Sequence, residues 1–351
     1  MRVLVFKGSY DVIRKSGIGR AIDNQIEALR KNNVDYTENS EEYYDIVHLN
    51  TVFPNSVMMA LRAKIHGKKI VYYGHSTMED FKRSFTGSNL IAPLFKQWLK
   101  FCYSLGDLII TPTDYSKRIL MGYGLKKPIV ALSNGIDLKE YTGKKSDTSE
   151  FRKTYNIREN EKVIIGVGHY IERKGILDFV EMAKRLPQYK FIWFGYTDPK
   201  LIPTTIKNAL KVELPNLIFA GYVEKNQLIK AYAGADLFWF PTWEETEGIV
   251  LLEAMATGIP VLVRDIEIYR EWLPENVVLH KAKDIAGFEN KIKEFFAGSL
   301  PDLTDAAYKL VCNNDIEAIG NKLYLLYKQY FTSLFRNSGY LFYKQIARVR
   351  D

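Results

Sequence analysis

Two carboxylates in one short apolar stretch are the strongest candidates for chemistry in this sequence. Residues 241–260 read Pro-Thr-Trp-Glu-Glu-Thr-Glu-Gly-Ile-Val-Leu-Leu-Glu-Ala-Met-Ala-Thr-Gly-Ile-Pro, with seven residues between Glu245 and Glu253. We expect a loop to end near Gly248 and an apolar helix to begin there. The first amides of a helix lack internal partners and suit a diphosphate, and glycine lets a ligand approach the backbone. The stretch predicts a nucleotide-sugar site whose two carboxylates read hydroxyls; an ordinary amphipathic helix is the alternative.

The elements that must position this stretch alternate between strands and helices. Strand-like apolar runs occupy residues 3–6, 46–49, 69–73, 108–111 and 129–132, then 163–167, 191–194, 217–219, 237–240 and 261–263. Helical patterns such as 18–31, 175–186 and 225–233 lie between them. This alternation predicts an α/β protein with doubly wound parallel sheets, in which ligands bind beyond the carboxyl ends of strands.

The length of 351 residues favours two domains. We expect an N-terminal Rossmann-like domain for the acceptor and membrane over residues 1–138 and a polar linker over 139–161. A second Rossmann-like domain, for the nucleotide-sugar, follows over 162–325. A C-terminal helix over 326–351 then returns to the first domain.

Two cysteines, Cys102 and Cys312, lack metal-ligand spacing and indicate no disulfide framework, which fits a reducing cytoplasm. Met1 leads directly into a strand pattern, so we expect no signal peptide, and no run of eighteen apolar residues could span a bilayer. The sequence contains no Asp-x-Asp pair, so we expect neither a metal ion nor another cofactor.

The stretch at 241–260 resembles the Glu-x7-Glu motif of retaining glycosyltransferases of family 4. Asn134-Gly135-Ile136-Asp137 is similar to the family's Asn-Gly-Val-Asp signature. This resemblance implies the GT-B fold, two Rossmann-like domains facing across a cleft, and an enzyme that transfers a hexose from a UDP-sugar with retention. The implied mechanism is front-face attack, in which the departing diphosphate takes the acceptor's proton and neither a protein nucleophile nor a metal takes part.

The resemblance also implies which residues bind the donor. The glycine pair that follows the first strand matches the acceptor-side glycine loop of the family, although such a pair is often only a turn. Residues after the later strands match the loops that hold the base and the diphosphate. The candidate donor-binding residues are Gly17, Gly19, His169, Gly195, Tyr222, Val223, Glu245, Glu247, Gly248, Ile249, Val250 and Glu253.

Four residues are candidates for catalysis by the same resemblance. His75 follows a buried-looking strand, where the family has a histidine that contacts the donor sugar; a packing histidine is the alternative. In the segment 166–175, Lys174 occupies the family's diphosphate-binding lysine position, and His169 stands where an arginine is usual. Arg173 is next to the lysine and could replace that arginine, or could belong to a solvated turn. Positive charge there would stabilise the leaving diphosphate, and Glu245 completes the set.

The net charge of +8 is concentrated in two segments. Residues 58–105 carry eight basic against two acidic residues, and residues 322–351 carry six against one. Such asymmetry indicates an anionic partner. We expect an amphipathic helix near 89–103, together with residues 58–69, to contact an anionic membrane; core packing is the alternative. The apolar side of this helix would consist of Leu94, Phe95, Trp98, Leu99 and Phe101. The candidate membrane and acceptor residues are Lys64, Lys68, Lys69, Lys82, Arg83, Lys96, Trp98 and Lys100.

The pattern further resembles glycolipid synthases of Gram-positive bacteria. That resemblance implies UDP-glucose or UDP-galactose as donor, monoglucosyl-diacylglycerol as acceptor, and a diglycosyl product of the kind that anchors lipoteichoic acid. It places the protein in the cytoplasm, peripherally on the inner face of the cell membrane. The alternatives are an acceptor glycan of a capsule or exopolysaccharide, free or polyprenyl-linked, or a non-catalytic binder of membrane surfaces or nucleic acid. Intact Glu245, Glu253 and Lys174 argue against a non-catalytic protein, and no nucleic-acid module is recognisable.

Overall fold

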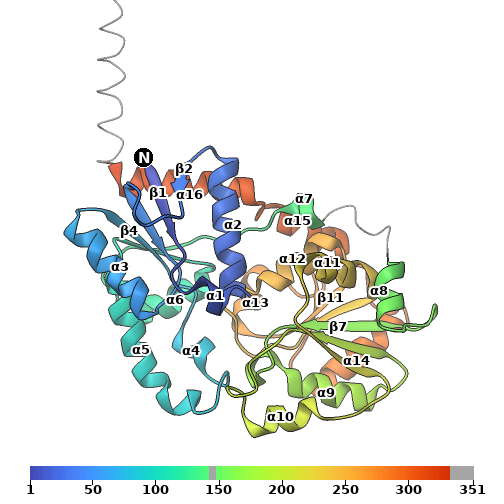
Figure 1. The fold of residues 1–351 in the computed structure, drawn as a ribbon. Helices are drawn as coiled ribbons and strands as arrows, with labels where there is room; N and C mark the ends of the chain where they lie inside the picture. The colour runs from blue at the N-terminus through green and yellow to red at the C-terminus, as the bar shows by residue number, and fades with distance from the viewer. Residues whose placement is uncertain (142–147, 333–351) are drawn as a thin grey trace, which may run out of the picture. The chain divides into compact units, whose positions relative to one another are not determined.

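The computed structural model describes residues 1–141 and 148–332. The chain forms two compact units (Figure 1). The first comprises Met1–His75, Lys96–Gly135 and the described part of the chain from Asn314 onward; the second comprises Ser76–Phe95 and Ile136–Asn313. The domain boundaries expected above remain predictions. Residues 142–147 of the expected linker and residues 333–351 of the expected C-terminal helix, including most of the basic tail, lie outside the described residues.

The first unit is built on a six-stranded parallel sheet in the order β2-β1-β3-β4-β5-β6. Its strands are β1 (Arg2–Phe6), β2 (Asp35–Thr37), β3 (Ile46–Leu49), β4 (Lys69–Tyr73), β5 (Leu108–Thr111) and β6 (Ile129–Ala131). The order reverses between β1 and β3, which makes the sheet doubly wound. The four residues of β3 and of β5 are all buried, as expected of parallel strands covered on both faces.

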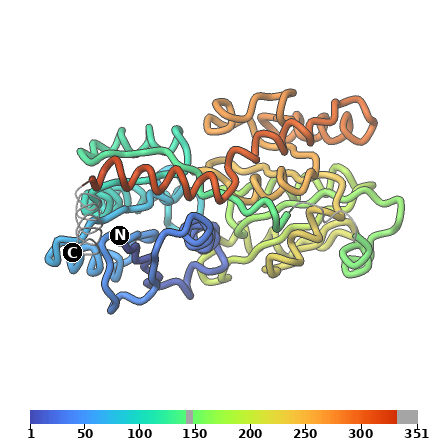
Figure 2. Tube along the Cα trace, turned by 90° about the horizontal axis from the view of Figure 1, so that it is seen from above, coloured from blue at the N-terminus to red at the C-terminus, as the bar shows by residue number. Residues whose placement is uncertain are grey.

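The helices of the first unit are α1 (Tyr10–Ile13), α2 (Gly17–Lys31), α3 (Pro54–Ile65), α6 (Asp114–Gly122) and α16 (Ile316–Tyr330). Helix α5 (Ser88–Ser104) begins in the second unit and ends in the first. Although α16 is remote in sequence from the rest of the first unit, it packs along α2, and Figure 2 shows it in red among the elements of that unit. Ile319, Leu323 and Tyr327 of α16 join the core formed by β1, β3, β4 and β5.

The second unit has its own six-stranded parallel sheet, in the order β12-β11-β10-β7-β8-β9. Its strands are β7 (Val163–Val167), β8 (Lys190–Phe194), β9 (Leu217–Gly221), β10 (Leu237–Phe240), β11 (Val261–Arg264) and β12 (His280–Ala282). This is the strand order of a Rossmann fold, with its switch point between β7 and β10.

The second unit contains both short and long helices. They are α4 (Met78–Phe81), α7 (Leu138–Tyr141), α8 (Ser149–Thr154), the 3₁₀ turn η1 (Glu172–Lys174), α9 (Ile176–Arg185), α10 (Thr204–Leu210), α11 (Lys225–Gly234), α12 (Ile249–Thr257), α13 (Glu267–Trp272), α14 (Ile285–Phe296) and α15 (Thr304–Cys312). Helix α12 is buried along nearly its whole length because α7, α11 and α15 pack around it.

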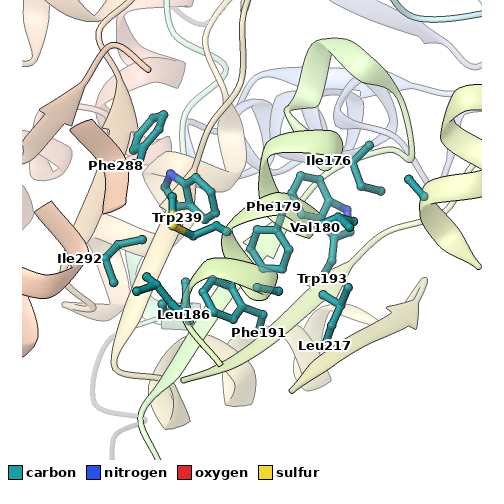
Figure 3. Close-up of a cluster of buried hydrophobic side chains, with 14 of the residues drawn as sticks. Ile176, Phe179, Val180, Leu186, Phe191, Trp193, Leu217, Trp239, Phe288 and Ile292 are labelled. Carbon is teal, nitrogen blue, oxygen red and sulfur yellow. The ribbon is translucent and has the colours of Figure 1, made fainter. Parts of the chain in front are cut away.

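Aromatic side chains fill one face of the second sheet (Figure 3). Phe179 of α9 lies edge-on to Trp193 of β8 and stacked on Trp239 of β10, with ring centroids 5.0 and 5.4 Å apart. Both indoles are fully buried. Large rings bury more apolar area per residue than aliphatic chains, so this cluster fixes α9 against the strands that carry the site.

The predicted fold class is confirmed: each unit is a doubly wound parallel sheet with helices. Every predicted apolar run is a strand, within two residues at its ends. The prediction missed β2 and β12, the two three-residue edge strands, whose sequences Asp-Tyr-Thr and His-Lys-Ala contain no apolar run.

Candidate functional site

The candidate residues of the second unit lie where its central strands end. Lys174 follows β7, Gly195 follows β8, and Glu245 follows β10. These strands are neighbours in the sheet, so their carboxyl ends bring the three loops together at the switch point. The sequence could predict this meeting because each loop follows an apolar strand.

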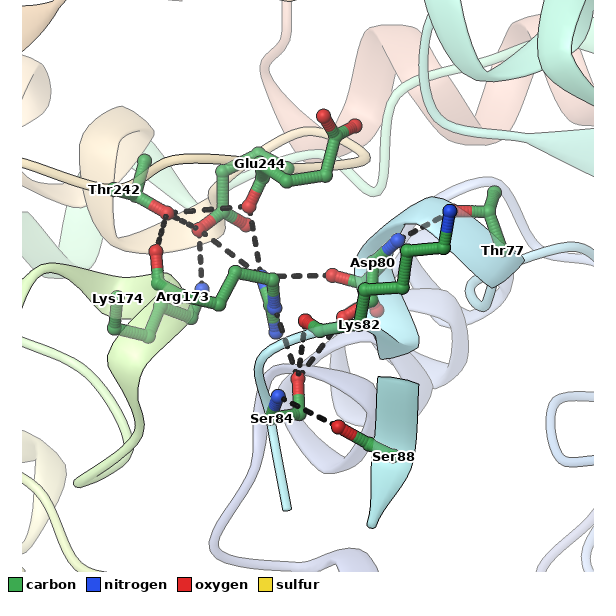
Figure 4. A network of polar contacts seen from close by, with 10 residues as sticks. Thr77, Asp80, Lys82, Ser84, Ser88, Arg173, Lys174, Thr242 and Glu244 are labelled. Atoms are coloured by element: carbon green, nitrogen blue, oxygen red, sulfur yellow. Dashed lines mark hydrogen bonds and ion pairs between the residues drawn. The ribbon is translucent and has the colours of Figure 1, made fainter. Parts of the chain in front are cut away.

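Lys174 and Glu245 form a buried ion pair, in which the lysine ammonium donates to Oε1 of the glutamate. The hydroxyl of Thr242 donates to the same oxygen at 2.8 Å and is itself fully buried. Figure 4 shows Lys174 and Thr242 in this network. The loop after β10 therefore presents a carboxylate whose orientation is fixed from two sides.

Arg173 is also buried, at 7% exposure, and reaches the same cluster from η1 (Figure 4). Its Nη1 lies 2.8 Å from Asp80 Oδ1 and donates to the carbonyl of Glu244 at 2.8 Å. Its Nε donates to Ser84 Oγ at 3.2 Å, and Nη1 lies 3.7 Å from Glu245 Oε1. The guanidinium thus fastens the segment around Asp80 and Ser84 to the loop after β10, and its role towards a diphosphate remains a prediction.

The charges of the cluster control one another's protonation. Burial raises the pKa of Glu245, but Lys174 and Arg173 outweigh this and hold it below its usual value, so the carboxylate is ionised. Burial lowers the pKa of Lys174 against the opposing attraction of Glu245. Burial likewise raises the pKa of Asp80, although Arg173 opposes the shift. Two cations, Lys174 and Arg173, and two carboxylates, Glu245 and Asp80, therefore lie together in one buried cluster.

The start of α12 depends on Gly248, which caps the helix with φ +90. A Cβ atom there would lie 3.0 Å from the Tyr269 hydroxyl and 3.2 Å from Phe240 Cε1, and the φ value itself disfavours other residues. The Lys174 ammonium lies 5.4 Å from the centroid of the Phe240 ring. A glycine-capped helix start and a buried cation therefore share Phe240 as a neighbour.

Glu253 is buried inside α12, and its two oxygens accept hydrogen bonds from two tyrosines. Tyr141 donates to Oε1 at 2.9 Å and Tyr232 donates to Oε2 at 3.2 Å. Neighbouring Glu247 and Ile249 are buried as well, and Val250 is half-buried. The carboxylate is held in place, and its contact with a ligand remains a prediction.

The loops after β7, β8 and β9 approach one another through glycines. A Cβ on Gly195, whose φ is +140, would lie 1.9 Å from the carbonyl oxygen of Gly168. The amide of Gly195 donates to the Gly221 carbonyl at 2.8 Å. Next in sequence, His169 is half-buried, Tyr222 is 37% exposed and Val223 is half-buried. No side chain fits at Gly195, whereas Gly221 has open space around it and is favoured as glycine by its φ of +74.

In the first unit, His75 lies just beyond β4 and is 7% exposed. Its Nε2 is 2.9 Å from Oδ1 of Asn50, and Asn50 exchanges two hydrogen bonds with Gln25 of α2, at 2.7 and 3.0 Å. Burial lowers the pKa of His75 to about 4, so the ring is neutral near pH 7. The ring also stacks on Tyr73, with centroids 5.7 Å apart.

Gly17 and Gly19 open α2 in the first unit, as predicted. Gly19 requires glycine, because a Cβ there would lie 2.6 Å from the Ile13 carbonyl oxygen, whereas Gly17 faces open space. Ser16 caps the helix by accepting from the Gly19 amide at 3.4 Å. The pair thus has a local structural reason, and its part in ligand binding remains a prediction.

Several residues that order the site had no signal in the sequence. Arg264, at the end of β11, donates to the Pro241 carbonyl at 3.1 Å, pairs with Asp178 at 2.5 Å and stacks on Trp243 at 3.6 Å. It thereby fixes the loop that carries Glu245. Such long-range contacts have no fixed spacing along a chain. Asn50, Asp80, Tyr141 and Tyr232 likewise contact residues far away in the sequence.

The candidate membrane residues are spread over both units. Lys64, Lys68, Lys69, Lys96, Trp98 and Lys100 belong to the first unit, and Lys82 and Arg83 to the second. On α5, Leu94, Trp98 and Phe101 are exposed, whereas Leu99 is fully buried and Phe95 is half-buried, so Leu99 belongs to the core and not to an exposed apolar face. Arg83 lies 3.8 Å from Glu172, and its backbone carbonyl accepts from the Arg173 amide at 3.0 Å.

Across the part of the chain that the structure describes, no helix is long and apolar enough to cross a membrane. Within the same residues, no three His, Cys, Asp or Glu side chains gather in a way that could hold a metal ion.

Comparison with known families matches both units. Residues 147–309 match the family Glycosyl transferases group 1, and residues 36–140 match Glycosyltransferase Family 4. A processive diacylglycerol alpha-glucosyltransferase of Acholeplasma laidlawii is 39% identical over 94% of this chain and 98% of its own length. An alpha-galactosylglucosyldiacylglycerol synthase of Streptococcus pneumoniae is 25% identical over 74% of this chain and 71% of its own.

Solved structures show the same fold. Anabaena HepE in complex with UDP-glucose superposes with a TM-score of 0.75 and 15% identity, over 94% of this chain and 100% of that one. The resemblance found in the motifs is therefore confirmed. The chain belongs to glycosyltransferase family 4, has the GT-B fold, and is an enzyme that transfers a hexose from a UDP-sugar.

Proposed function

We propose that this protein transfers glucose from UDP-glucose to a glucosyl-diacylglycerol with retention of configuration. The observation that supports a UDP-sugar donor site here is the buried pair of Lys174 and Glu245, which lies close to the glycine-capped start of α12. A cation and a helix start together suit a diphosphate that gains charge as the sugar leaves.

The surroundings of Glu245 and Glu253 are consistent with retention by front-face attack, which requires no carboxylate nucleophile. Glu245 is held in an ion pair and Glu253 by two tyrosines, so neither is presented as a free nucleophile. In the proposed step, the acceptor hydroxyl attacks the anomeric carbon as the bond to the diphosphate breaks. The departing diphosphate oxygen takes the hydroxyl's proton, so the charges balance without a covalent enzyme intermediate.

The lipid acceptor is proposed from the relatives. The Acholeplasma and Streptococcus proteins are named for sugar transfer to diacylglycerol lipids, and the first is similar along nearly the whole chain. Such an acceptor lies in a bilayer, so the enzyme must work at a membrane surface, and we place it peripherally on the cytoplasmic face.

The first unit offers a surface for that contact, which we name the α3–α5 patch. It consists of the exposed apolar side chains Met58, Leu61, Ile65, Trp98 and Phe101. The Trp98 indole donates to the Val52 carbonyl at 2.8 Å, which holds α5 beside the start of α3. Lys64 on α3 and Lys100 on α5 add positive charge, so the patch suits an anionic bilayer.

A transfer assay tests the proposed reaction. Vesicles containing glucosyl-diacylglycerol are incubated with enzyme and radiolabelled UDP-glucose or UDP-galactose, and the anomeric configuration of the lipid product is read by NMR. We expect an α-linked diglucosyl lipid. A β-linked product would overturn retention, labelling from UDP-galactose alone would overturn glucose as the donor sugar, and labelling of only a water-soluble glycan would overturn the lipid acceptor.

Vesicle flotation tests the membrane contact separately. The double variant Met58→Ser/Ile65→Ser should lose binding to vesicles rich in phosphatidylglycerol. The matched control Val12→Ser/Met121→Ser, which removes exposed apolar residues elsewhere in the first unit, should keep it. Equal losses in both variants would contradict a role for the α3–α5 patch.

A further inference from the structure

The half-buried ring of His169 has one hydrogen whose position is fixed. Its Nδ1 lies 2.7 Å from the carbonyl oxygen of Tyr196, just beyond β8. A carbonyl oxygen can only accept, so Nδ1 must carry a hydrogen in every protonation state of the ring. In the neutral ring, Nε2 therefore has a lone pair and can only accept.

The surroundings of the ring favour that neutral form before a ligand binds. Burial lowers the pKa of His169; the Tyr196 carbonyl and Glu245 oppose this, and the cations Lys174 and Arg173 reinforce it. These three charged groups act on the ring from η1 and from the loop after β10, and the segment just beyond β8 contributes the Tyr196 carbonyl. The free protein near pH 7.5 thus holds a neutral imidazole near two cations, Lys174 and Arg173, and one carboxylate, Glu245.

A nucleotide-sugar diphosphate changes this balance. Its oxygens only accept hydrogen bonds, so a neutral ring would turn a lone pair towards them, whereas an imidazolium would donate from Nε2. The negative charges of the diphosphate also favour the charged ring. A permanent cation at this position, such as an arginine, would need no proton.

We infer that His169 binds the donor diphosphate as an imidazolium, so that the nucleotide-sugar enters the site together with one proton from solvent. This inference rests on the proposed donor site in the second unit. It makes His169 a donor-binding residue whose protonation sets the pH dependence of donor affinity. Between the pKa of the free ring and the higher pKa of the bound ring, the dissociation constant should rise by up to about tenfold per pH unit, as linkage requires.

Calorimetric titration with UDP-glucose, without acceptor lipid, tests this directly. The diphosphate diester of UDP-glucose does not itself titrate near neutral pH, so any proton taken up is bound by the protein. Titrations at pH 6.5, 7.5 and 8.5 in two buffers of different ionisation enthalpy give the number of protons taken up. We expect uptake of up to one proton by the wild-type protein.

Three variants locate that proton. His169→Arg supplies a permanent cation and His169→Gln a neutral donor, so both should bind UDP-glucose with no proton uptake and with a flat pH dependence. The matched control His280→Gln removes another histidine of the second unit whose pKa burial lowers, and it should keep the wild-type uptake.

The outcomes separate this inference from the proposed function. If UDP-glucose bound with no proton uptake at all three pH values, this result would overturn the inference alone. Uptake that persists in His169→Arg would also overturn it, since the proton would then enter another group. Absence of UDP-glucose binding by the wild-type protein would overturn the proposed donor and this inference with it.

Discussion

At the scale of single residues, the pair of Lys174 and Glu245 carries both stability and chemistry. Lys174→Met leaves Glu245 buried without the cation that donates to it, with only Arg173 at 3.7 Å, which should lower the free energy of unfolding by about 3 kcal/mol. Adding Glu245→Gln removes the orphaned charge and should restore most of that stability. Transfer should fall by about 100-fold or more in both variants, because the diphosphate loses its cation.

Thermal unfolding and transfer rates measured on the same preparations check this prediction. If the double variant recovered transfer along with stability, Lys174 would be a structural residue only. The ionised Glu245 also predicts a sign with pH: its pKa is lowered in the fold, so its contribution to stability is complete above about pH 4.5 and is lost as the pH falls further.

Gly248 is the second residue for which the structure makes a specific prediction. Gly248→Ala forces alanine into φ +90 and sets a methyl group 3.0 Å from the Tyr269 hydroxyl. We expect a loss of stability of about 1–2 kcal/mol and weaker UDP-glucose binding, because the start of α12 must shift. Gly122→Ala is the matched control, since Gly122 has open space around it and an ordinary φ. Equal UDP-glucose affinity in the wild type and Gly248→Ala, measured by calorimetry, would remove α12 from the donor site.

At the scale of elements, the sequence predicted the strands and helix starts that depend on a local pattern of residues. Apolar runs such as Val163–Val167 place the strands, and the glycine before an apolar helix places the start of α12. The sequence could not place the segment Ser76–Phe95 in the second unit. Its position there depends on contacts of Asp80 and Ser84 with Arg173, which lies far along the chain. Propensity acts over a few residues, whereas such contacts depend on the folded arrangement.

Helix α16 is held to the first unit by one buried polar contact as well as by packing. The Tyr327 hydroxyl lies 2.6 Å from Nε2 of His48, and burial lowers the pKa of His48 to about 3, so this hydrogen bond joins the hydroxyl to a neutral ring. His48 Nδ1 is already buried without a partner among the described residues.

Tyr327→Phe leaves the second nitrogen of His48 unsatisfied too, and should lower the free energy of unfolding of the first unit by about 1–3 kcal/mol. Tyr330→Phe changes a partly exposed ring of the same helix and should have almost no effect. Denaturant unfolding followed by circular dichroism compares the two. If they were equal, packing alone would hold α16.

At the scale of the whole molecule, buried histidines predict sensitivity to acid. His48 and His75 have folded pKa values of about 3 and about 4, below the usual 6.5. The unfolded chain therefore binds more protons between pH 6.5 and 4, so stability must fall as the pH falls through this window. At pH 5, each histidine should cost about 2 kcal/mol relative to pH 7.5.

Scanning calorimetry at pH 7.5 and pH 5.0 measures this loss as a drop in the midpoint of unfolding. His75→Gln keeps a donor for Asn50 but cannot titrate, so its midpoint should fall less than that of the wild-type protein. A drop of the same size in both would show that carboxylates, and not this histidine, set the sensitivity.

Location of the donor is the most direct test of the account as a whole. A crystal structure with bound UDP-glucose should show the diphosphate at the start of α12, within hydrogen-bond reach of Lys174 and of His169 Nε2. A nucleotide bound anywhere else, or a diphosphate that contacts neither Lys174 nor the amides that follow Gly248, would contradict it.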